Sequence, residues 1–210
     1  MSEHIPPIES ERRIATVMFA DISGFTAMSE KMDPEDVADV MKDCFSLMGA
    51  CIEEYGGTID KFIGDCVMVL FGAPQAQEDA PQRALNTALQ IRTRLKDFNA
   101  ERQLSCPLDI HIGINTGEVI AGLMGSDKRQ DFTVMGDTVN LASRLEGAAE
   151  TGSILISENT YRLTEGYFDF AYAGEVQVKG KEQPSRPGVC SAPGASSPAS
   201  IPATPRGSRP

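Results

Sequence analysis

Apolar positions along the chain follow two periods, one typical of strands and the other of amphipathic helices. The clearest helical stripe runs from Val37 to Tyr55, where apolar side chains recur every three or four residues. The clearest strand is 108–115, where isoleucines alternate with other residues and predict one buried face. Helices are predicted at 24–32, 33–55, 79–101, 136–150 and 158–164, and strands at 14–20, 58–63, 66–71, 108–115, 118–124, 132–135, 154–156 and 167–178.

Several boundaries between these elements are set by residues with known turn or capping preferences. Asp33 and Pro34 suit the cap and the first turn of the long helix. Gly64–Asp65 is all that separates two strands, so it must form a hairpin turn, for which glycine supplies the positive φ. Thr116–Gly117 is predicted as a turn between two further strands, and the polar segment 125–131 as an exposed loop or hairpin tip.

The order of predicted elements up to Ile114 is β-α-α-β-β-α-β, which contains the split βαβ arrangement of ferredoxin-like folds. Because the central hairpin is antiparallel, we expect an α+β fold with an antiparallel-rich mixed sheet and flanking helices. The predicted domain covers 13–183 after a short N-terminal extension, 1–12. From 184 to 210 the sequence is rich in Pro, Ser, Ala and Gly without periodicity, so this tail is predicted to be disordered.

The charge balance limits the partners of the chain. Nineteen basic and 30 acidic residues give a net charge of −11, which disfavours nucleic acid and anionic membranes, so an anionic ligand needs a local basic cluster. No apolar run reaches the ~20 residues of a membrane span, and the polar N-terminus lacks the apolar core of a signal peptide. Five scattered cysteines without a CxxC pair fit a reducing compartment. We therefore expect a cytoplasmic chain without membrane insertion.

Two aspartates stand at strand ends that the split βαβ arrangement brings together. Asp21 ends the first apolar run, just before a Ser-Gly turn that opens a helix, and Asp65 lies in the hairpin turn. The first strand lies beside the hairpin in this arrangement, so the two carboxylates converge, and a divalent cation relieves their repulsion. Free amides at the helix start also suit a polyphosphate carried by the metal. The alternative is that both aspartates are exposed in turns and share no ligand.

Three further residues carry candidate chemistry. Lys61 lies four residues before Asp65, in the strand that enters the turn. Asn140 and Arg144 are four residues apart and share a helix face, where an amide and a guanidinium suit a ribose oxygen and a phosphate. The alternative for Arg144 is a surface salt bridge. His111, a lone histidine on its strand, is interpreted as structural.

Four segments resemble motifs of the class III nucleotidyl cyclases, namely FADISGFT at 19–26, GTIDKFIGD at 57–65, GINTG at 113–117 and GDTVNLASR at 136–144. The resemblance runs from about Arg13 to Lys181, with the motifs in order and at fitting spacing. It implies a homodimer with its active sites at the subunit interface. It also implies that each site binds ATP together with two divalent metal ions, Mg²⁺ or Mn²⁺.

The resemblance implies a role for each matching residue. Asp21 and Asp65 match the two metal-binding aspartates, with the carbonyl of Ile22 as an additional ligand. One metal ion lowers the pKa of the ribose 3′-hydroxyl, the other stabilises the leaving pyrophosphate, and the 3′-oxygen attacks the α-phosphorus in line. The remaining roles are base reading by Lys61 and Thr133, ribose orientation by Asn140, transition-state stabilisation by Arg144, and binding of the terminal phosphates by Lys179, with Lys128 or Arg129 as further candidates from the loop.

The base-reading pair, Lys61 and Thr133, indicates the substrate. A lysine offers only donors, which suits the acceptor N1 of adenine, whereas guanine presents a donor there. The Thr133 hydroxyl can accept from the adenine 6-amino group, and guanylyl cyclases of the family resembled carry Glu and Cys at these places instead. We therefore expect an adenylyl cyclase that makes 3′,5′-cyclic AMP and pyrophosphate from ATP. Thr rather than Asp at position 133 resembles a subgroup that responds to bicarbonate, so bicarbonate activation is a further implication.

The sequence leaves alternatives open and departs from the family pattern once. A guanylyl cyclase is one alternative, and a catalytically inactive cyclase-like domain for dimerisation or regulation is another, although all seven key positions are suitably filled. A diguanylate cyclase or related nucleotidyltransferase also uses paired carboxylates, but the Gly-Gly-Asp/Glu-Glu-Phe turn is absent. Pro184 and Pro187 stand where the last family strand should run, so we expect that strand, which follows Lys179, to be short or at an edge. The chain starts almost at the first strand and shows no regulatory domain, so we expect a domain cut from something larger.

Overall fold

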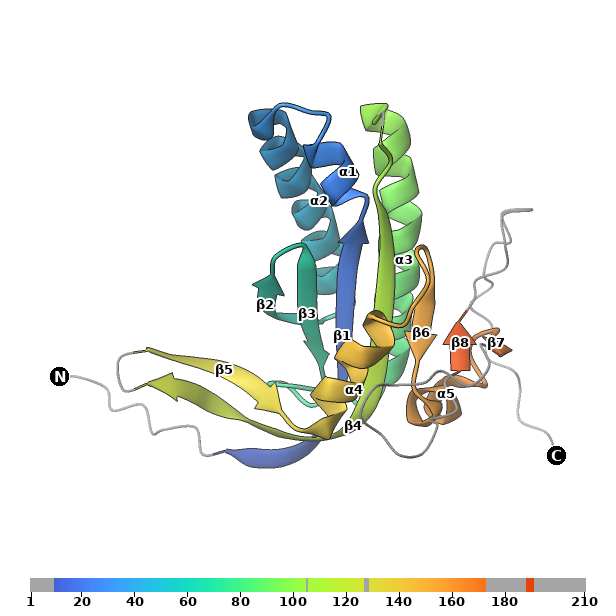
Figure 1. Ribbon diagram of the computed structural model, residues 1–210. Helices are drawn as coiled ribbons and strands as arrows, with labels where there is room; N and C mark the ends of the chain where they lie inside the picture. Colours follow the sequence, from blue (N-terminus) through green and yellow to red (C-terminus); the bar gives the residue numbers. More distant parts are fainter. Residues whose placement is uncertain (1–9, 105, 127–128, 173–187, 191–210) are drawn as a thin grey trace.

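The computed structural model describes residues 10–104, 106–126, 129–172 and 188–190 (Figure 1). In chain order its elements are β1 Glu11–Ser23, α1 Phe25–Ser29, α2 Pro34–Glu54, β2 Thr58–Ile63, β3 Cys66–Phe71, α3 Ala80–Arg102, β4 Asp109–Ser126, β5 Arg129–Met135, α4 Asp137–Glu146, β6 Ile154–Ile156, α5 Glu158–Thr164, β7 Ala171–Tyr172 and β8 Gly188–Cys190. The bounds of β2, β3, β6 and α5 are those predicted, whereas β1 also takes in residues 11–12 of the expected extension. Within the described ranges, no helix has the length and apolar character needed to cross a membrane.

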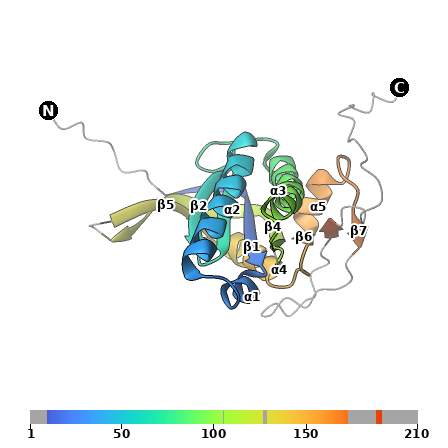
Figure 2. The ribbon, with the colours of Figure 1, turned by 90° about the horizontal axis from the view of Figure 1, so that it is seen from above.

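The sheet is built around β1. Its strand order is β2-β3-β1-β4-β6-β8-β7, and β5 pairs with β4 off this path. β4 and β6 run parallel, while the other pairs of described strands are antiparallel. α2 and α3 cover one face of the sheet, and α4 lies on the other (Figures 1 and 2). The order of β2, β3, β1 and β4 is that of the split βαβ fold, so the predicted α+β class with a mixed sheet is confirmed.

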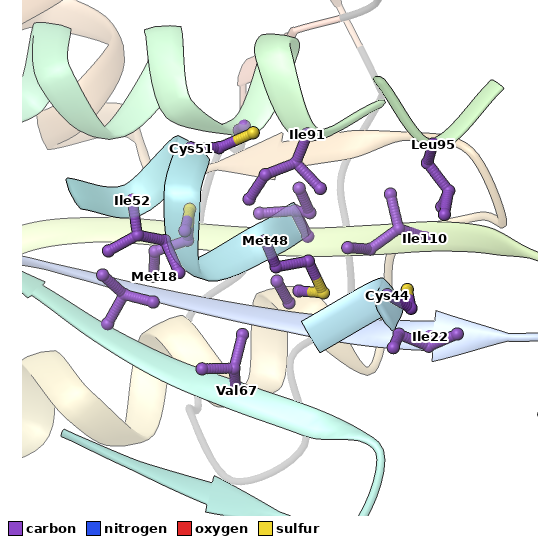
Figure 3. Packing of buried hydrophobic residues seen from close by; sticks show 14 of the residues in the cluster. Met18, Ile22, Cys44, Met48, Cys51, Ile52, Val67, Ile91, Leu95 and Ile110 are labelled. Carbon is purple, nitrogen blue, oxygen red and sulfur yellow. The ribbon is translucent and has the colours of Figure 1, made fainter. Parts of the chain in front are cut away.

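β1 is apolar on both sides because both faces of the sheet are covered. On one side Met18 and Ile22 pack into the larger core with α2 and α3 (Figure 3). On the other side Val17 and Phe19 pack into a smaller core that includes residues of α4 and β5. A strand buried on both faces shows a continuous apolar run rather than alternation. Asp21 is the first charged side chain after this run, so it stands where the strand leaves the core.

β4 is one continuous strand, and the prediction of a turn at Thr116–Gly117 is wrong. The strand stays in unbroken antiparallel register with the whole of β1. A Cβ at Gly113 would lie 2.1 Å from the Glu146 nitrogen, and one at Gly117 would lie 2.7 Å from Thr138 Oγ1. Both glycines therefore leave space for α4 to lie directly against β4. Gly117, interpreted from the sequence as a turn residue, instead allows α4 to pack closely on β4.

The later part of the chain differs from the sequence prediction in further places. β4 and β5 extend into 125–131, so this segment is a hairpin whose tip, 127–128, is outside the described residues. The strand predicted at 167–178 begins only at Ala171 and is described as far as Tyr172. β8 falls within the tail predicted to be disordered, and it is paired with β6 on one side and β7 on the other. β8 is three residues long, as expected for a short strand after Lys179, but it lies between two other strands rather than at an edge.

Candidate active site

The end of β1 lies beside the β2–β3 turn. Asp21 stands opposite Cys66 of β3 on one side and opposite His111 of β4 on the other, so these three side chains share one face of the sheet. The main-chain N–H of Ile22 donates to the carbonyl oxygen of Asp65 at 3.4 Å, which ties the turn to β1. The structure therefore brings Asp21 and Asp65 together at one edge.

Burial and neighbouring charges disfavour the ionisation of Asp21 and Glu146 at this edge. Burial raises the pKa of Asp21 above its ordinary value, and the charge of Asp65 and a side-chain hydrogen bond with it raise this pKa further. Burial also raises the pKa of Glu146 on α4, against the opposing charge of His111 and with an added rise from Asp21. Closely spaced carboxyls with raised pKa values form a site where a cation is favourable.

His111 connects this edge of the sheet to α4. Its Nε2 lies 2.9 Å from Glu146 Oε1 and 3.4 Å from Asp21 Oδ2, while its Nδ1 lies 2.8 Å from Ser23 Oγ. One ligand atom from each of Asp21, His111 and Glu146 lies within 4.8 Å of the other two. The histidine interpreted as structural from the sequence is thus part of the acidic cluster.

The side-chain atoms available as metal ligands at this edge of the sheet fit a hard divalent cation. The carboxylate oxygens of Asp21 and Asp65 are the ligand type that Mg²⁺ and Mn²⁺ prefer. Cys66 is unsuited to such a role, because burial raises the pKa of its thiol to about 12 and the group stays protonated near neutral pH. The residues present therefore suit an oxygen-ligated metal rather than a thiolate site.

Lys61 and Thr133 meet although they come from distant parts of the chain. Thr133 lies in β5 and Lys61 in β2. Lys61 Nζ donates to Thr133 Oγ1 at 3.4 Å. Asp60 joins both residues, since Thr133 Oγ1 donates to Asp60 Oδ2 at 3.1 Å and Lys61 Nζ lies 3.0 Å from the same oxygen. The residues expected to read the base thus form one contact group within a single chain.

Asn140 and Arg144 lie on the side of α4 that is turned away from the sheet. The helix buries Ala142 and Leu145, and a rotation of about 100° per residue places Asn140 and Arg144 far from this buried stripe. Asn140 is exposed and Arg144 is half-buried. Glu146 of the same helix contacts His111 instead. The two candidates therefore point away from the acidic cluster of their own chain.

The surface salt bridge considered for Arg144 is not observed among the residues that the structure describes. The side chains of three other predicted site residues are not described by the structure. Lys128 and Lys179 lie outside the described residues, and Arg129 begins β5 opposite Ser126 with only its main chain described. Their predicted contacts with phosphates stay predictions.

A hollow of 230 Å³ lies beside the site, between α4 and α5. Its lining consists of Asn115, Leu141, Leu145, Ser157, Glu158, Asn159 and Arg162. None of the residues predicted to bind metal, base or phosphate lines it. The hollow shares α4 and β4 with the candidate site but none of its predicted residues, so it is not the nucleotide site expected from the sequence.

Three site residues were missed by the sequence reasoning. His111 alternates onto the face of β4 that α4 covers, which was a usable signal because Asp21 stands on the same face. Asp60 precedes Lys61 inside a recognised motif and was passed over as part of the strand. Glu146 gave no signal, because its position depends on how closely α4 approaches β4.

Comparison with known proteins identifies a family that matches most of this chain. Residues 9–186 match the family described as the adenylate and guanylate cyclase catalytic domain. An adenylate cyclase from Anabaena cylindrica is 36% identical over 192 residues, which cover 86% of this chain and 37% of that relative. The chain thus spans well under half of the relative's length.

Two solved structures are similar over most of the chain. The adenylyl cyclase CyaB from P. aeruginosa has a TM-score of 0.83 and 40% identity, over 86% of this chain and 95% of that one. The guanylyl cyclase Cya2 has a TM-score of 0.77 and 38% identity, over 86% of this chain and 92% of that one. Because the two similar enzymes are named for different nucleotides, similarity alone does not select ATP or GTP.

Proposed function

Because the chain belongs to the family of adenylate and guanylate cyclase catalytic domains, we propose that it converts ATP to 3′,5′-cyclic AMP and pyrophosphate. The observation that carries the choice of nucleotide is the contact of Lys61 Nζ with Thr133 Oγ1 at 3.4 Å. A lysine donates to adenine N1 and a threonine hydroxyl accepts from the 6-amino group, whereas guanine reverses both groups. The name of the Anabaena cylindrica relative supports the same choice.

In this proposal Asp21 and Asp65 hold two divalent ions, Mg²⁺ or Mn²⁺, with the Ile22 carbonyl as an additional ligand. Bound ions would acidify the ribose 3′-hydroxyl and neutralise charge on the triphosphate. Asn140 orients the ribose through its amide. The Arg144 guanidinium stabilises the charge that develops on the α-phosphate oxygens as the 3′-oxygen attacks in line.

Two sites at the interface of a homodimer follow from the direction of α4. Asn140 and Arg144 face away from the acidic cluster of their own chain, so they suit a nucleotide held by the aspartates of a second copy. Each copy then gives its metal ligands to one site, and it gives the other site Lys61, Thr133, Asn140, Arg144 and Lys179. We further propose that Lys179, with Lys128 or Arg129, binds the terminal phosphates.

One assay tests the proposed reaction. The purified chain is incubated with Mn²⁺ and either ATP or GTP, and the products are separated by chromatography. We expect cyclic AMP and pyrophosphate from ATP, and a loss of at least about 100-fold in rate for Asp21→Ala or Asp65→Ala with the fold retained. Cyclic GMP as the main product would make the chain a guanylyl cyclase, and no product from either nucleotide would favour the regulatory module.

Two further parts of the proposal concern conditions. The cytoplasm is the proposed compartment, supported by the free cysteines Cys44, Cys51, Cys66 and Cys106 among the described residues.

Activation by bicarbonate is proposed from Thr133 and the subgroup that it resembles. Cyclic AMP formation should rise with bicarbonate at fixed pH and ionic strength, and a response equal to that of matched chloride would end this part of the proposal.

A further inference from the structure

Asp60 has an unusual position in β2. The β2–β3 ladder shifts register between Ile59 and Lys61, so Asp60 is the extra residue of a bulge. Its side chain is 0% exposed, whereas 49% of the neighbouring Lys61 side chain is accessible. The bulge therefore turns a carboxylate inward, against the base-reading pair.

The contacts of Asp60 decide which hydrogen-bond donor of Lys61 and which acceptor of Thr133 remain available to the base. An ionised carboxylate only accepts, so the Thr133 hydroxyl must direct its proton to Asp60 Oδ2, which lies 3.1 Å from Thr133 Oγ1. Lys61 Nζ donates to one lone pair of Thr133 Oγ1 at 3.4 Å, which leaves one lone pair. Of the three ammonium protons of Lys61, one faces Asp60 Oδ2 at 3.0 Å and one faces Thr133, which leaves one proton.

We propose that Asp60 is a specificity-determining positioning residue that fixes the pair as one donor and one acceptor, so that a 6-aminopurine nucleotide is accepted and a 6-oxopurine is rejected. This inference rests on the proposed function, because it takes Lys61 and Thr133 as the groups that read the base. Adenine N1 accepts the remaining Lys61 proton, and the 6-amino group donates to the remaining Thr133 lone pair. Guanine sets donor against donor and acceptor against acceptor.

A purely structural role does not account for a carboxylate at this position. Asp60 Oδ1 is buried and has no hydrogen-bond partner in the part of the chain that the structure describes. A buried acceptor without a partner costs free energy, and the link that Oδ2 makes between β2 and β5 does not account for this second oxygen. What the carboxylate adds is an acceptor that cannot donate. Without it, the Thr133 hydroxyl is free to rotate and to donate to a 6-oxo group.

The test compares the ratio of kcat/KM for ATP to kcat/KM for GTP in the wild type and in Asp60→Asn. The ratio should fall by about tenfold or more, because an amide lets the Thr133 hydroxyl donate to guanine O6. A residue that only holds β2 against β5 would lower both values by the same factor, and an unchanged ratio overturns the proposal. Asp39→Asn makes the same change at an exposed position of α2 and should leave the ratio as it is.

A double-variant cycle checks that Asp60 acts through Thr133. Thr133→Val removes the hydroxyl, so adding Asp60→Asn in that background should change the ratio by less than about twofold. A tenfold change in that background would overturn the proposed route. If Asp60→Asn does not fold, Asp60→Ser takes its place in both comparisons with the same expectation, because a serine hydroxyl also donates.

The outcomes separate this inference from the proposed function. If the wild type uses GTP better than ATP, the proposed function fails and the role of Asp60 fails with it. If the wild type prefers ATP and Asp60→Asn keeps that preference, only the role of Asp60 fails. If neither nucleotide is turned over, the ratio of the dissociation constants for ATP and GTP in Mg²⁺ replaces kcat/KM, and the same fall in Asp60→Asn is expected.

Discussion

The behaviour of an acidic side chain in this protein depends on its neighbours rather than on its residue type. Asp79 accepts a hydrogen bond from Arg83, which lowers the pKa of Asp79. Burial and the charge of Asp65 raise the pKa of Asp21 instead. Ionised Asp21 therefore costs folding free energy until a cation neutralises the pair. Carboxyls held in this way are typical of a binding site rather than of a stabilising ion pair.

We expect Asp21→Asn to stabilise the metal-free protein near neutral pH. The pKa of Asp21 is raised above 3.8 in the folded state, so the cost of ionisation is absent below that value and grows as the pH rises through the raised pKa. The amide removes this cost, and a gain of ~1 kcal/mol corresponds to a rise in Tm of about 2–4 °C. Thermal unfolding in EDTA over a range of pH measures the difference, which should vanish towards acidic pH.

Added Mg²⁺ or Mn²⁺ should reverse this order of stability. The ion stabilises the folded wild type by mass action, whereas Asp21→Asn lacks a ligand. Asp39→Asn, exposed on α2, is the matched control and should show neither effect. A lower Tm for metal-free Asp21→Asn than for the wild type would contradict the electrostatic description of the site.

Lys61→Glu combined with Thr133→Cys is expected to weaken the use of ATP. The carboxylate places an acceptor against adenine N1, and a thiol is a poor partner for the 6-amino group, so kcat/KM for ATP should fall by about 100-fold. Gain of GTP activity is not required, because the pocket must also fit the shape of guanine. An ATP preference that survives in the double variant would remove both residues from the base contact.

At the scale of elements, the site depends on how closely α4 approaches β4. Gly113 leaves no space for a side chain, since its Cβ would lie 2.1 Å from a main-chain nitrogen of α4. This approach places Glu146 against His111 and sets the direction in which Arg144 points. A main-chain atom cannot move aside as a flexible side chain does, so a single methyl group at this point displaces the helix.

Gly113→Ala should therefore lower the free energy of unfolding by about 1–3 kcal/mol or more and reduce cyclase activity. Gly49→Ala is the matched control, because no atom beyond the adjoining backbone of α2 lies within 4 Å of its Cβ position. Alanine favours a helix interior over glycine, so this control should gain about 0.5–1 kcal/mol without loss of activity. Urea unfolding measures both, and equal midpoints for the two variants would mean that α4 does not lie this close to β4.

At the scale of the whole molecule, the proposed site is divided between two copies. One chain presents Asp21 at the end of β1 and Asp65 in the adjacent β2–β3 turn, and it presents Asn140 and Arg144 on the outer side of α4. In a symmetric dimer, each of two sites then combines residues of both chains. Activity per chain should fall on dilution, because dissociation destroys both sites at once.

Mixing two inactive variants tests this division. Asp21→Ala and Arg144→Ala should each be nearly inactive as homodimers. After free exchange of equal amounts, about half of the dimers pair the two variants, and each such dimer has one site with both changes and one with neither. Activity should therefore return to about a quarter of the wild type. No recovery, with exchange shown by capture of one tagged variant through the other, would place both residues in one chain's site.

The sequence by itself determined the elements whose signals are local. The bounds of β2 and β3 followed from two apolar runs separated only by Gly64–Asp65, and that turn had to be a hairpin for steric reasons. The order of elements then predicted that β1 lies beside the hairpin, and the ladder between β1 and β3 confirms it. The four short motifs were sufficient to recognise the cyclase family, because each keeps its residue types at fixed spacing.

Only the tertiary structure decided which side chains meet across long distances in the chain. His111 and Glu146 join Asp21 because α4 packs against β4, and Asp60 meets Thr133 because the β4–β5 hairpin reaches β2. Glycine at position 117 was misread as a turn, since its purpose is visible only when α4 is in place. The strand after Lys179 was expected to be short or at an edge, and the position of β8 between β6 and β7 was not predictable because these partners come from other segments of the chain. Periodicity and capping report a residue's local neighbours, whereas these contacts depend on how separate elements pack together.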